Sequence, residues 1–265
     1  MAKNKSPDGD GLPKELFEAH WDLLGESFMA LVRSFDASAT LPSATKEAVT
    51  IVLHKKGEKD ELNNYRPITL LNFTYKVIAR VVLDWMKLVL HLVISPEQYG
   101  FIAGRRLSDA VALVADVIDA AKNGAEDWGL HEITSTKLLV NGWLGKGVEV
   151  VSGVRQGCPL ALYLFLCAVD PLAREVERQE LGLSKQNLHF NYLGYVDDTT
   201  LALQGAEQIV KEEEVLDCFE KGSGLATNKS KSVLLPLGAN LGAKGDGTSS
   251  FKWAKADEAE RLLGV

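Results

Sequence analysis

The sequence is poor in cysteine, and this excludes two common ways of stabilising a small domain. Its 265 residues contain three cysteines, an odd number at scattered positions. This arrangement matches neither a disulfide framework nor a zinc-ligand pattern. We therefore expect a reducing compartment, in which these thiols are free or buried: Cys158, Cys167 and Cys218.

The sequence also lacks a run that could cross a membrane. Its most apolar stretch, residues 81–94, is interrupted by Asp84, Lys87 and His91 and is too short for a bilayer span. The first ten residues are polar and do not resemble a secretory signal. We expect a soluble, intracellular protein without a membrane partner, and nucleus and cytoplasm both stay open.

An excess of positive charge, which is typical of nucleic-acid-binding proteins, is absent as well. The 29 lysines and arginines are outnumbered by 36 aspartates and glutamates, so the formal net charge is −7. This balance argues mildly against contacts with phosphates. Net charge does not report where charges lie, however, and an acidic run such as residues 212–214 is typical of a solvated helix face.

An apolar content of 46% is sufficient for a large core.

The sequence does contain a mixture of helix and strand signals. Apolar spacing and helix start and stop residues predict helices over 14–35, 75–91, 108–121, 159–177 and 206–221. Short apolar runs predict strands over 48–53, 189–195, 199–203 and 232–235, and a hairpin over 138–151. The composition of residues 238–250 indicates a flexible linker, and we expect a further helix to begin within 251–265.

Two adjacent carboxylates lie between the strands expected over 189–195 and 199–203. Only a very short turn is left for them, Tyr195-Val196-Asp197-Asp198. Like charges held this close repel each other, and bound divalent cations relieve the repulsion. Mg²⁺ prefers carboxylate and phosphate oxygens, and two such ions can stabilise the attacking and leaving oxygens of a displacement at phosphorus. The alternative is an ordinary solvated turn, because aspartate is a common turn former.

Two further segments have the composition of a nucleotide-binding site. The glycines in residues 153–157 would let a base or sugar approach the backbone closely, within hydrogen-bonding reach of Gln156. Lys55, Lys56 and Arg66 flank a polar loop, where they would clamp a triphosphate. Taken singly, each segment is also compatible with an ordinary loop.

Together these segments resemble a known family. In chain order the sequence contains KSPDGDGLP, HKKGEKDELNNYRPITLLN, EQYGFIAGRR, GVRQGCPL, YVDD and SGLATNKSKS, which cover nearly all of residues 6–232. Their order and wording resemble the motifs of reverse transcriptases from non-LTR (LINE-type) retrotransposons. The YRPITLLN wording is more similar to this branch than to group II intron enzymes.

The resemblance implies roles for individual residues. Asp197 and Asp198 would bind the catalytic metal, which is a pair of Mg²⁺ ions in this family, with Asp197 the more secure ligand. Lys231 would protonate the leaving pyrophosphate. The remaining candidates would bind the triphosphate (Lys55 or Lys56, with Arg66), the incoming nucleotide and template base (Gln156, Gly157) and the nucleic-acid backbone (Arg105, Arg155). The implied partners are an RNA template, a DNA primer and deoxynucleoside triphosphates.

The resemblance also implies an α/β fold of the right-hand polymerase kind, with fingers and an incomplete palm. We expect an N-terminal loop over 1–13, a fingers-like region over 14–121, a deletion junction over 122–130, a partial palm over 131–236, and a flexible tail with the start of a truncated element over 237–265. We also expect the thumb of the family to be largely absent.

One motif of the family has no counterpart in the sequence. Its A motif, an apolar strand followed by an aspartate, belongs where residues 122–130 read as a deletion junction. Glu126 and Asp127 are acidic there but precede no strand pattern. We therefore expect a missing metal ligand, and beside the Tyr195 hairpin either a gap or a substitute strand from residues 138–151.

Two functions follow from these observations. The first is that of an RNA-directed DNA polymerase, a nucleotidyltransferase adding deoxynucleotides to a primer 3′-hydroxyl, inactive in this chain for lack of the A-motif aspartate. The alternative is a non-catalytic nucleic-acid-binding remnant, or a decayed or mis-spliced retroelement product.

Overall fold

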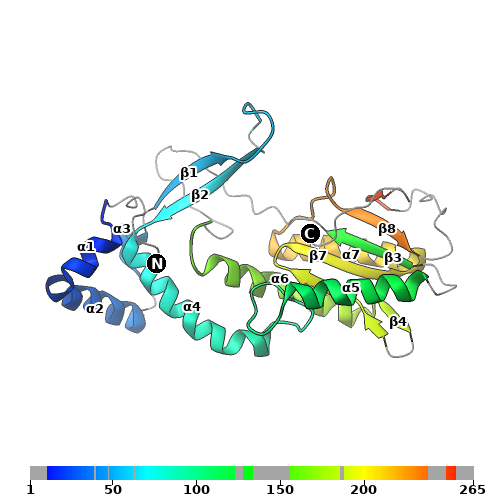
Figure 1. Cartoon of the computed structure of the whole chain (residues 1–265), viewed down its shortest axis with the longest axis horizontal. Coiled ribbons are helices and arrows are strands. Elements are labelled where there is room, and N and C mark those ends of the chain that lie inside the picture. Colours follow the sequence, from blue (N-terminus) through cyan, green and yellow to red (C-terminus); the bar gives the residue numbers. More distant parts are fainter. Residues whose placement is uncertain are drawn as a thin grey trace. The chain divides into compact units, whose positions relative to one another are not determined.

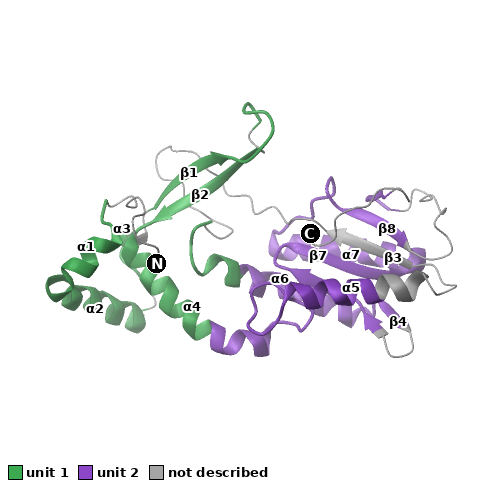
Figure 2. Cartoon of the chain, viewed as in Figure 1, with its two compact units in different colours: residues 1–86, 139–164 green, residues 87–138, 165–265 purple. Residues whose placement is uncertain are grey.

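A computed structural model gives the fold of the chain. The structure describes residues 11–38, 40–46, 48–61, 64–122, 128–133, 156–185, 188–237 and 249–254. The chain divides into two compact units: unit 1 comprises residues 1–86 and 139–164, and unit 2 comprises residues 87–138 and 165–265 (Figure 2). Both helices and sheets are present, which confirms the α/β prediction. None of the helices in the described ranges combines the length and apolar character that a membrane span requires.

Unit 1 contains short helices and one strand pair (Figure 1). Its elements are α1 (Lys14–Ala19), α2 (Trp21–Ser38), α3 (Ser43–Lys46), β1 (Ala48–His54), β2 (Tyr65–Leu71) and the first part of α4 (Phe73–Val93). The prediction of a single helix over 14–35 was wrong, because the chain leaves helical geometry at His20. The break lets Phe17 stack on Phe73, with ring centroids 4.5 Å apart, whereas Trp21 packs on Phe28.

The start of α4 is fixed by one asparagine. Asn72 precedes the helix, and its Oδ1 accepts a hydrogen bond from the backbone nitrogen of Tyr75 at 2.8 Å, as an N-cap does. Its Nδ2 donates to the carbonyl of Thr45 at 2.8 Å, which ties α3 to α4. The strand predicted over 48–53 is confirmed as β1, which pairs antiparallel with β2 from Ala48 opposite Leu71 to His54 opposite Tyr65.

Unit 2 is built on one sheet. Its elements after the end of α4 are α5 (Leu107–Lys122), β3 (Trp128–Ile133), most of α6 (Ala161–Arg178), β4 (Leu183–Lys185), β5 (Leu188–Phe190), β6 (Tyr192–Tyr195), β7 (Asp198–Gln204), α7 (Gly205–Ser223), β8 (Val233–Leu237) and β9 (Lys252–Trp253). The five-stranded sheet has the order β6-β7-β3-β8-β9, and β4 and β5 form a separate pair.

This sheet is covered on both faces. Leu201 and Leu203 of β7 pack in a core cluster with residues of α6 and α7, such as Val176 and Leu216. Ala202, between them in sequence, packs instead in a cluster with α5. Because successive residues of a strand point to opposite faces, β7 contributes to two cores and is buried over most of its length.

The expected vacancy in the sheet is filled. We predicted a gap beside the Tyr195 hairpin, or a strand from residues 138–151, which lie outside the described ranges. Instead β3 pairs antiparallel with β7 on one side and β8 on the other. The statement that Glu126 and Asp127 precede no strand was therefore wrong, since β3 begins at the next residue. The physical reason is that β7 and β8 each present backbone groups that need partners in a buried sheet.

The C-terminal region also differs from the prediction. We expected a linker through residue 250 and then a helix, but residues 249–254 are fixed against the sheet, and β9 pairs parallel with β8. The side-chain oxygen Oε1 of Glu213 accepts hydrogen bonds from Ser249 Oγ at 2.8 Å and the Ser250 backbone nitrogen at 2.7 Å. Phe251 is buried, and burial of this ring overrides the weak local helix preference. Residues 238–248 and 255–265 lie outside the described ranges.

Candidate active site

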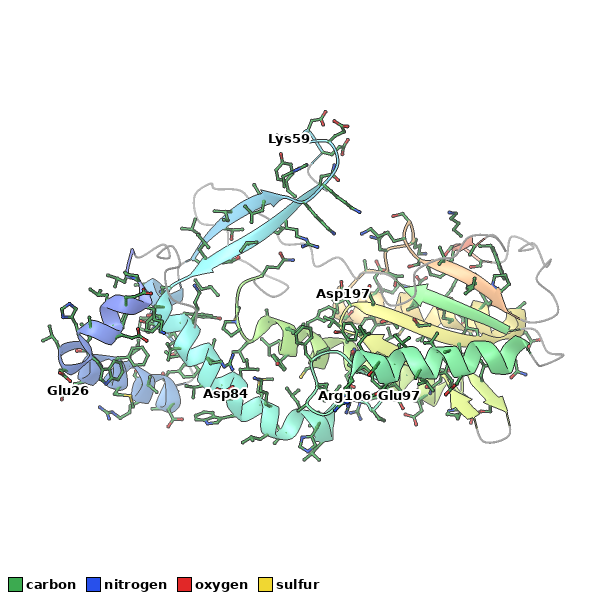
Figure 3. The ribbon with its side chains drawn as sticks, viewed as in Figure 1. Glu26, Lys59, Asp84, Glu97, Arg106 and Asp197 are labelled. Atoms are coloured by element: carbon green, nitrogen blue, oxygen red, sulfur yellow. The ribbon has the colours of Figure 1, made fainter. Side chains whose placement is uncertain are left out.

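The carboxylate pair lies at the tip of a hairpin. β6 and β7 pair antiparallel, and Tyr195 opposite Asp198 is the last pair of the ladder. Val196 and Asp197 therefore form a two-residue turn, and Figure 3 shows Asp197 at the end of the strand pair. Asp197 and Asp198 are both half-buried, so the turn is neither sealed nor fully solvated.

The turn has one unusual backbone angle. Val196 adopts a positive φ of 63°, a conformation rare for a β-branched residue. Its backbone nitrogen donates a hydrogen bond of 3.0 Å to Oε1 of Gln98, in the segment between α4 and α5. Sequence reasoning missed Gln98, although it lies in a segment that we had singled out. The available signal was the valine itself, which needs support in such a short turn.

β3 brings a further carboxylate-bearing position toward the tip. In the register of the sheet Ile133 is opposite Thr199 and Glu132 is opposite Thr200, two residues from Asp198. Trp128 is opposite Gln204, at the other end of β7. Glu126 and Asp127 precede that distant end in sequence and lie outside the described ranges. No aspartate occurs between Trp128 and Thr136, and the loss of the A-motif aspartate stays a prediction.

The residues at the tip are of the right type for Mg²⁺ but few in number. Carboxylate oxygens are the ligands that Mg²⁺ prefers, and Asp197 and Asp198 supply them from adjacent positions. Within the described ranges no group of three or more histidine, cysteine, aspartate or glutamate side chains is placed to hold a metal. Metal binding by the pair therefore stays a prediction.

The predicted general acid lies in a loop with defined hydrogen bonds. Lys231 precedes β8 and is exposed, and its backbone nitrogen donates to the Asn228 carbonyl at 2.9 Å. The same carbonyl accepts from both the backbone nitrogen and the hydroxyl of Ser232, each at 3.0 Å, and Ser232 is fully buried. The catalytic role of Lys231 stays a prediction.

The basic candidates of unit 1 lie on the β1–β2 hairpin. Lys55 and Lys56 directly follow β1, and Arg66 is opposite Leu53 in β2, so the three cations share one end of the strand pair. Lys56 and Arg66 are exposed. Lys59 lies at the far end of the hairpin loop (Figure 3).

This loop is folded back on itself. The imidazole Nε2 of His54 lies 2.9 Å from the Gly57 carbonyl, and the Tyr65 hydroxyl donates to the Lys59 carbonyl at 2.8 Å. The backbone nitrogen of Lys55 donates to the Asn64 carbonyl at 2.7 Å. The cations are therefore presented from an ordered hairpin end, while their contact with a triphosphate stays a prediction.

Gln156 and Gly157 are attached to the same hairpin. The Gln156 carbonyl accepts a hydrogen bond of 2.7 Å from the Thr69 backbone nitrogen in β2. A Cβ added to Gly157, whose φ is 110°, would lie 2.4 Å from the Thr69 carbonyl oxygen. The close approach that this glycine permits is thus made by β2, whereas we had expected a nucleotide there. A nucleotide contact of Gln156 stays a prediction, and Arg155 lies outside the described ranges.

Arg105 has a structural role that the sequence did not indicate. Its guanidinium donates to the carbonyls of Ser95 and Gln98, each at 2.6 Å, and of Ile94 at 3.1 Å. Burial lowers the pKa of Arg105, and the nearby Glu97 raises it in part. The predicted contact with the nucleic-acid backbone stays a prediction. Asp197 belongs to unit 2 and Gln156 to unit 1, so their meeting at one nucleotide also stays a prediction.

Comparison with known proteins decides the family. A family model described as "Reverse transcriptase (RNA-dependent DNA polymerase)" matches residues 53–254, which include the hairpin tip. The chain belongs to the reverse transcriptase family. The match covers the loop and second strand of the basic hairpin of unit 1 and the sheet of unit 2 of this reverse transcriptase chain.

Two relatives identify the LINE-type branch. The chain is 27% identical over 271 residues to the Transposon TX1 uncharacterized 149 kDa protein of Xenopus laevis, covering 88% of this chain and 21% of that protein. It is 28% identical over 268 residues to the Retrovirus-related Pol polyprotein from type-1 retrotransposable element R1 of Bradysia coprophila, covering 89% and 26%. The resemblance to LINE-type reverse transcriptases is thus confirmed. The chain spans about a fifth to a quarter of these relatives.

Proposed function

We propose that this chain contains the fingers (residues 14–121) and part of the palm (residues 131–236) of a LINE-type reverse transcriptase. The reaction of such a domain is RNA-templated DNA synthesis, in which a primer 3′-hydroxyl attacks a deoxynucleoside triphosphate and pyrophosphate leaves. The observation that supports this best is the position of Asp197 and Asp198 at the tip of a hairpin whose strands belong to a sheet buried on both faces.

Each candidate residue has a part in this reaction. Asp197 and Asp198 would hold Mg²⁺, which when bound stabilises the charge that develops on the reacting oxygens. Lys231 would donate a proton to the departing pyrophosphate. Lys56 and Arg66 would bind the triphosphate, the arginine through its two-pronged guanidinium.

We infer further that this chain does not catalyse the reaction. A two-metal displacement needs carboxylates that bridge both ions, and β3 ends without an aspartate. Among the acidic residues that would substitute, Glu132 has the register position nearest Asp198, since it is opposite Thr200. A glutamate set back along the strand would hold its carboxylate in a different place from an aspartate at the strand end.

A primer-extension assay on an RNA template with Mg²⁺ tests this proposal. We expect no extension by the chain. Extension that is lost in Asp197→Asn but kept in Asp36→Asn, a matched change of charge at an exposed position of α2, would show that the chain is active. In that case loss in Glu132→Gln would identify the substitute ligand.

The alternative function is nucleic-acid binding without catalysis. The observation that favours it is the group of cations at the end of the β1–β2 hairpin, where Lys56 and Arg66 are exposed. Phosphate contacts depend on such cations and not on the metal-binding carboxylates. Retained binding in Asp197→Asn, in a chain without extension activity, would support this alternative.

A further inference from the structure

The turn that holds the two aspartates has a backbone geometry suited to glycine. Val196 is the first of two residues between the paired Tyr195 and Asp198, and it alone of the two has a positive φ. In two-residue hairpins this is the type II′ pattern, which favours glycine at that position. A β-branched residue in this conformation is strained, and such strain persists only where surrounding structure holds it.

Gln98 provides the contacts that hold Val196. Its Oε1 accepts hydrogen bonds from the backbone nitrogens of Val196 at 3.0 Å and Gly100 at 3.1 Å, and its Nε2 lies 3.5 Å from the Val196 carbonyl oxygen. Because two N–H groups point at one atom, that atom must be the amide oxygen. Gln98 is 2% exposed, so water does not compete for these bonds.

The backbone around Gln98 also lies directly against the hairpin. Gln98 forms a parallel bridge with Gly194 of β6, and the Tyr99 nitrogen donates to the Gly194 carbonyl at 2.7 Å. A Cβ on Gly194 would lie 2.6 Å from the Gln98 Nε2, and a Cβ on Gly100 would lie 2.6 Å from the Val196 nitrogen. A side chain at Gly100 would therefore collide with the main chain of the turn, and one at Gly194 would displace the Gln98 amide.

The main chain of Gln98 is itself held by hydrogen bonds to other residues of unit 2. The Arg105 guanidinium donates to the carbonyls of Gln98, Ser95 and Ile94. The carboxylate of Asp170 in α6 accepts from the Ser95 nitrogen at 2.6 Å. The main chain of Gln98 is therefore tied through Arg105 and Ser95 to a helix of the same unit, and its position does not depend on the hairpin alone.

We propose that Gln98 is a positioning residue, which holds the main chain of Val196 and thereby fixes where Asp197 and Asp198 present their carboxylates to a divalent cation. The central residues of a two-residue turn have no partners in the strand ladder, and one side-chain amide supplies both a donor and an acceptor. The inference rests on the proposed function, because it concerns the same carboxylate pair.

The experiment compares two glutamines that make the same kind of bond. Gln98→Met removes the polar atoms at similar volume. Gln208→Met is the matched control, because Gln208 Oε1 also accepts two backbone N–H groups in unit 2, from Gly182 at 3.1 Å and Gln204 at 2.8 Å. Three quantities are measured in the full chain: urea stability, hydrogen exchange of the Val196 amide, and affinity for Mn²⁺ as a paramagnetic probe.

Both variants are expected to lose stability, and Gln98→Met should lose more, because Gln98 is buried whereas water reaches the exposed bond between Gln208 and Gln204. Only Gln98→Met should accelerate exchange of the Val196 amide, by about tenfold or more. Only Gln98→Met should weaken Mn²⁺ binding, again by about tenfold, as loss of a ligand-supporting contact does. In the background of Val196→Gly, where positive φ is unstrained, the effect of Gln98→Met on Mn²⁺ affinity should shrink.

Unchanged exchange at Val196 in Gln98→Met would overturn the inference. An equal loss of Mn²⁺ affinity in both variants would also overturn it, because general loosening would then account for the effect. If Asp197→Asn leaves the Mn²⁺ affinity of the parent chain unchanged, the proposed metal site fails instead. In that case the Val196 exchange still decides whether Gln98 holds the turn.

Discussion

The carboxylate of Asp170 in α6 accepts a hydrogen bond of 2.6 Å from the backbone nitrogen of Ser95, just after the end of α4. Its second oxygen accepts from the Arg174 Nε at 2.6 Å, and Arg174 also donates to the Val93 carbonyl. The hydrogen bond from Arg174 to Asp170 raises the pKa of Arg174. The end of α4 is therefore fastened to α6 by one buried carboxylate and its arginine.

Asp170→Ala is expected to destabilise unit 2 by about 2–3 kcal/mol, because the Ser95 N–H would lose its partner in a buried setting. Glu175→Ala is the control on the same helix, since it removes the exposed ion pair with Arg178 and should change stability by about 0.5 kcal/mol or less. Urea unfolding measures both. Equal losses in the two variants would show that the Ser95 contact is not what makes Asp170 important.

The basic end of the β1–β2 hairpin should govern nucleic-acid affinity. The double variant Lys56→Ala with Arg66→Ala is expected to weaken binding of an RNA–DNA hybrid at low salt. It should also reduce the slope of log affinity against log salt by about 2, since each phosphate contact contributes nearly one. Fluorescence anisotropy over a range of salt concentrations measures this slope.

The matched control removes the same charge from elsewhere in unit 1. Lys14 and Arg80 form helical ion pairs with Glu18 and Asp84, so the variant Lys14→Ala with Arg80→Ala lowers the net charge equally without touching the hairpin. It should leave the salt slope close to that of the parent chain. If both double variants reduced the slope alike, binding would follow net charge and the assignment to the hairpin would be wrong.

Stability in alkali should depend on Tyr192. Burial raises the pKa of this phenol to about 12 from 10.0. Between these values the unfolded chain ionises Tyr192 while the folded chain keeps it protonated, so the unfolded state is favoured as pH rises. The contribution is fully present below pH 10.0 and is lost progressively as the pH rises towards about 12.

Urea unfolding across this pH window checks the expectation against Tyr192→Phe. The phenylalanine keeps the ring within the cluster formed with α6 and α7 and removes only the hydroxyl, which lies 3.5 Å from the Thr199 hydroxyl. The variant should lose less stability than the parent chain over the same window. Parallel curves for the two proteins would mean that Tyr192 does not ionise on unfolding in this range.

Much of the site was determined locally and could be predicted. The apolar spacing that predicted helices over 75–91, 159–177 and 206–221 agrees with α4, α6 and α7 to within a few residues, because a helix is set by nearby side chains and end signals. The two strands around the Tyr195–Asp198 turn were visible for the same reason. The order of motifs was also sufficient to indicate the family.

The rest was decided by contacts between distant parts of the chain. β3 has little strand signal of its own, and it forms because β7 and β8 offer two ladders of unpaired backbone groups. The hydrogen bond between Gln98 and Val196 joins residues 98 positions apart, and no local sequence pattern predicts such a bond. Sequence thus specified which acids lie in the turn. Tertiary structure decided how that turn is held, since a strained backbone needs partners that only the folded chain brings to it.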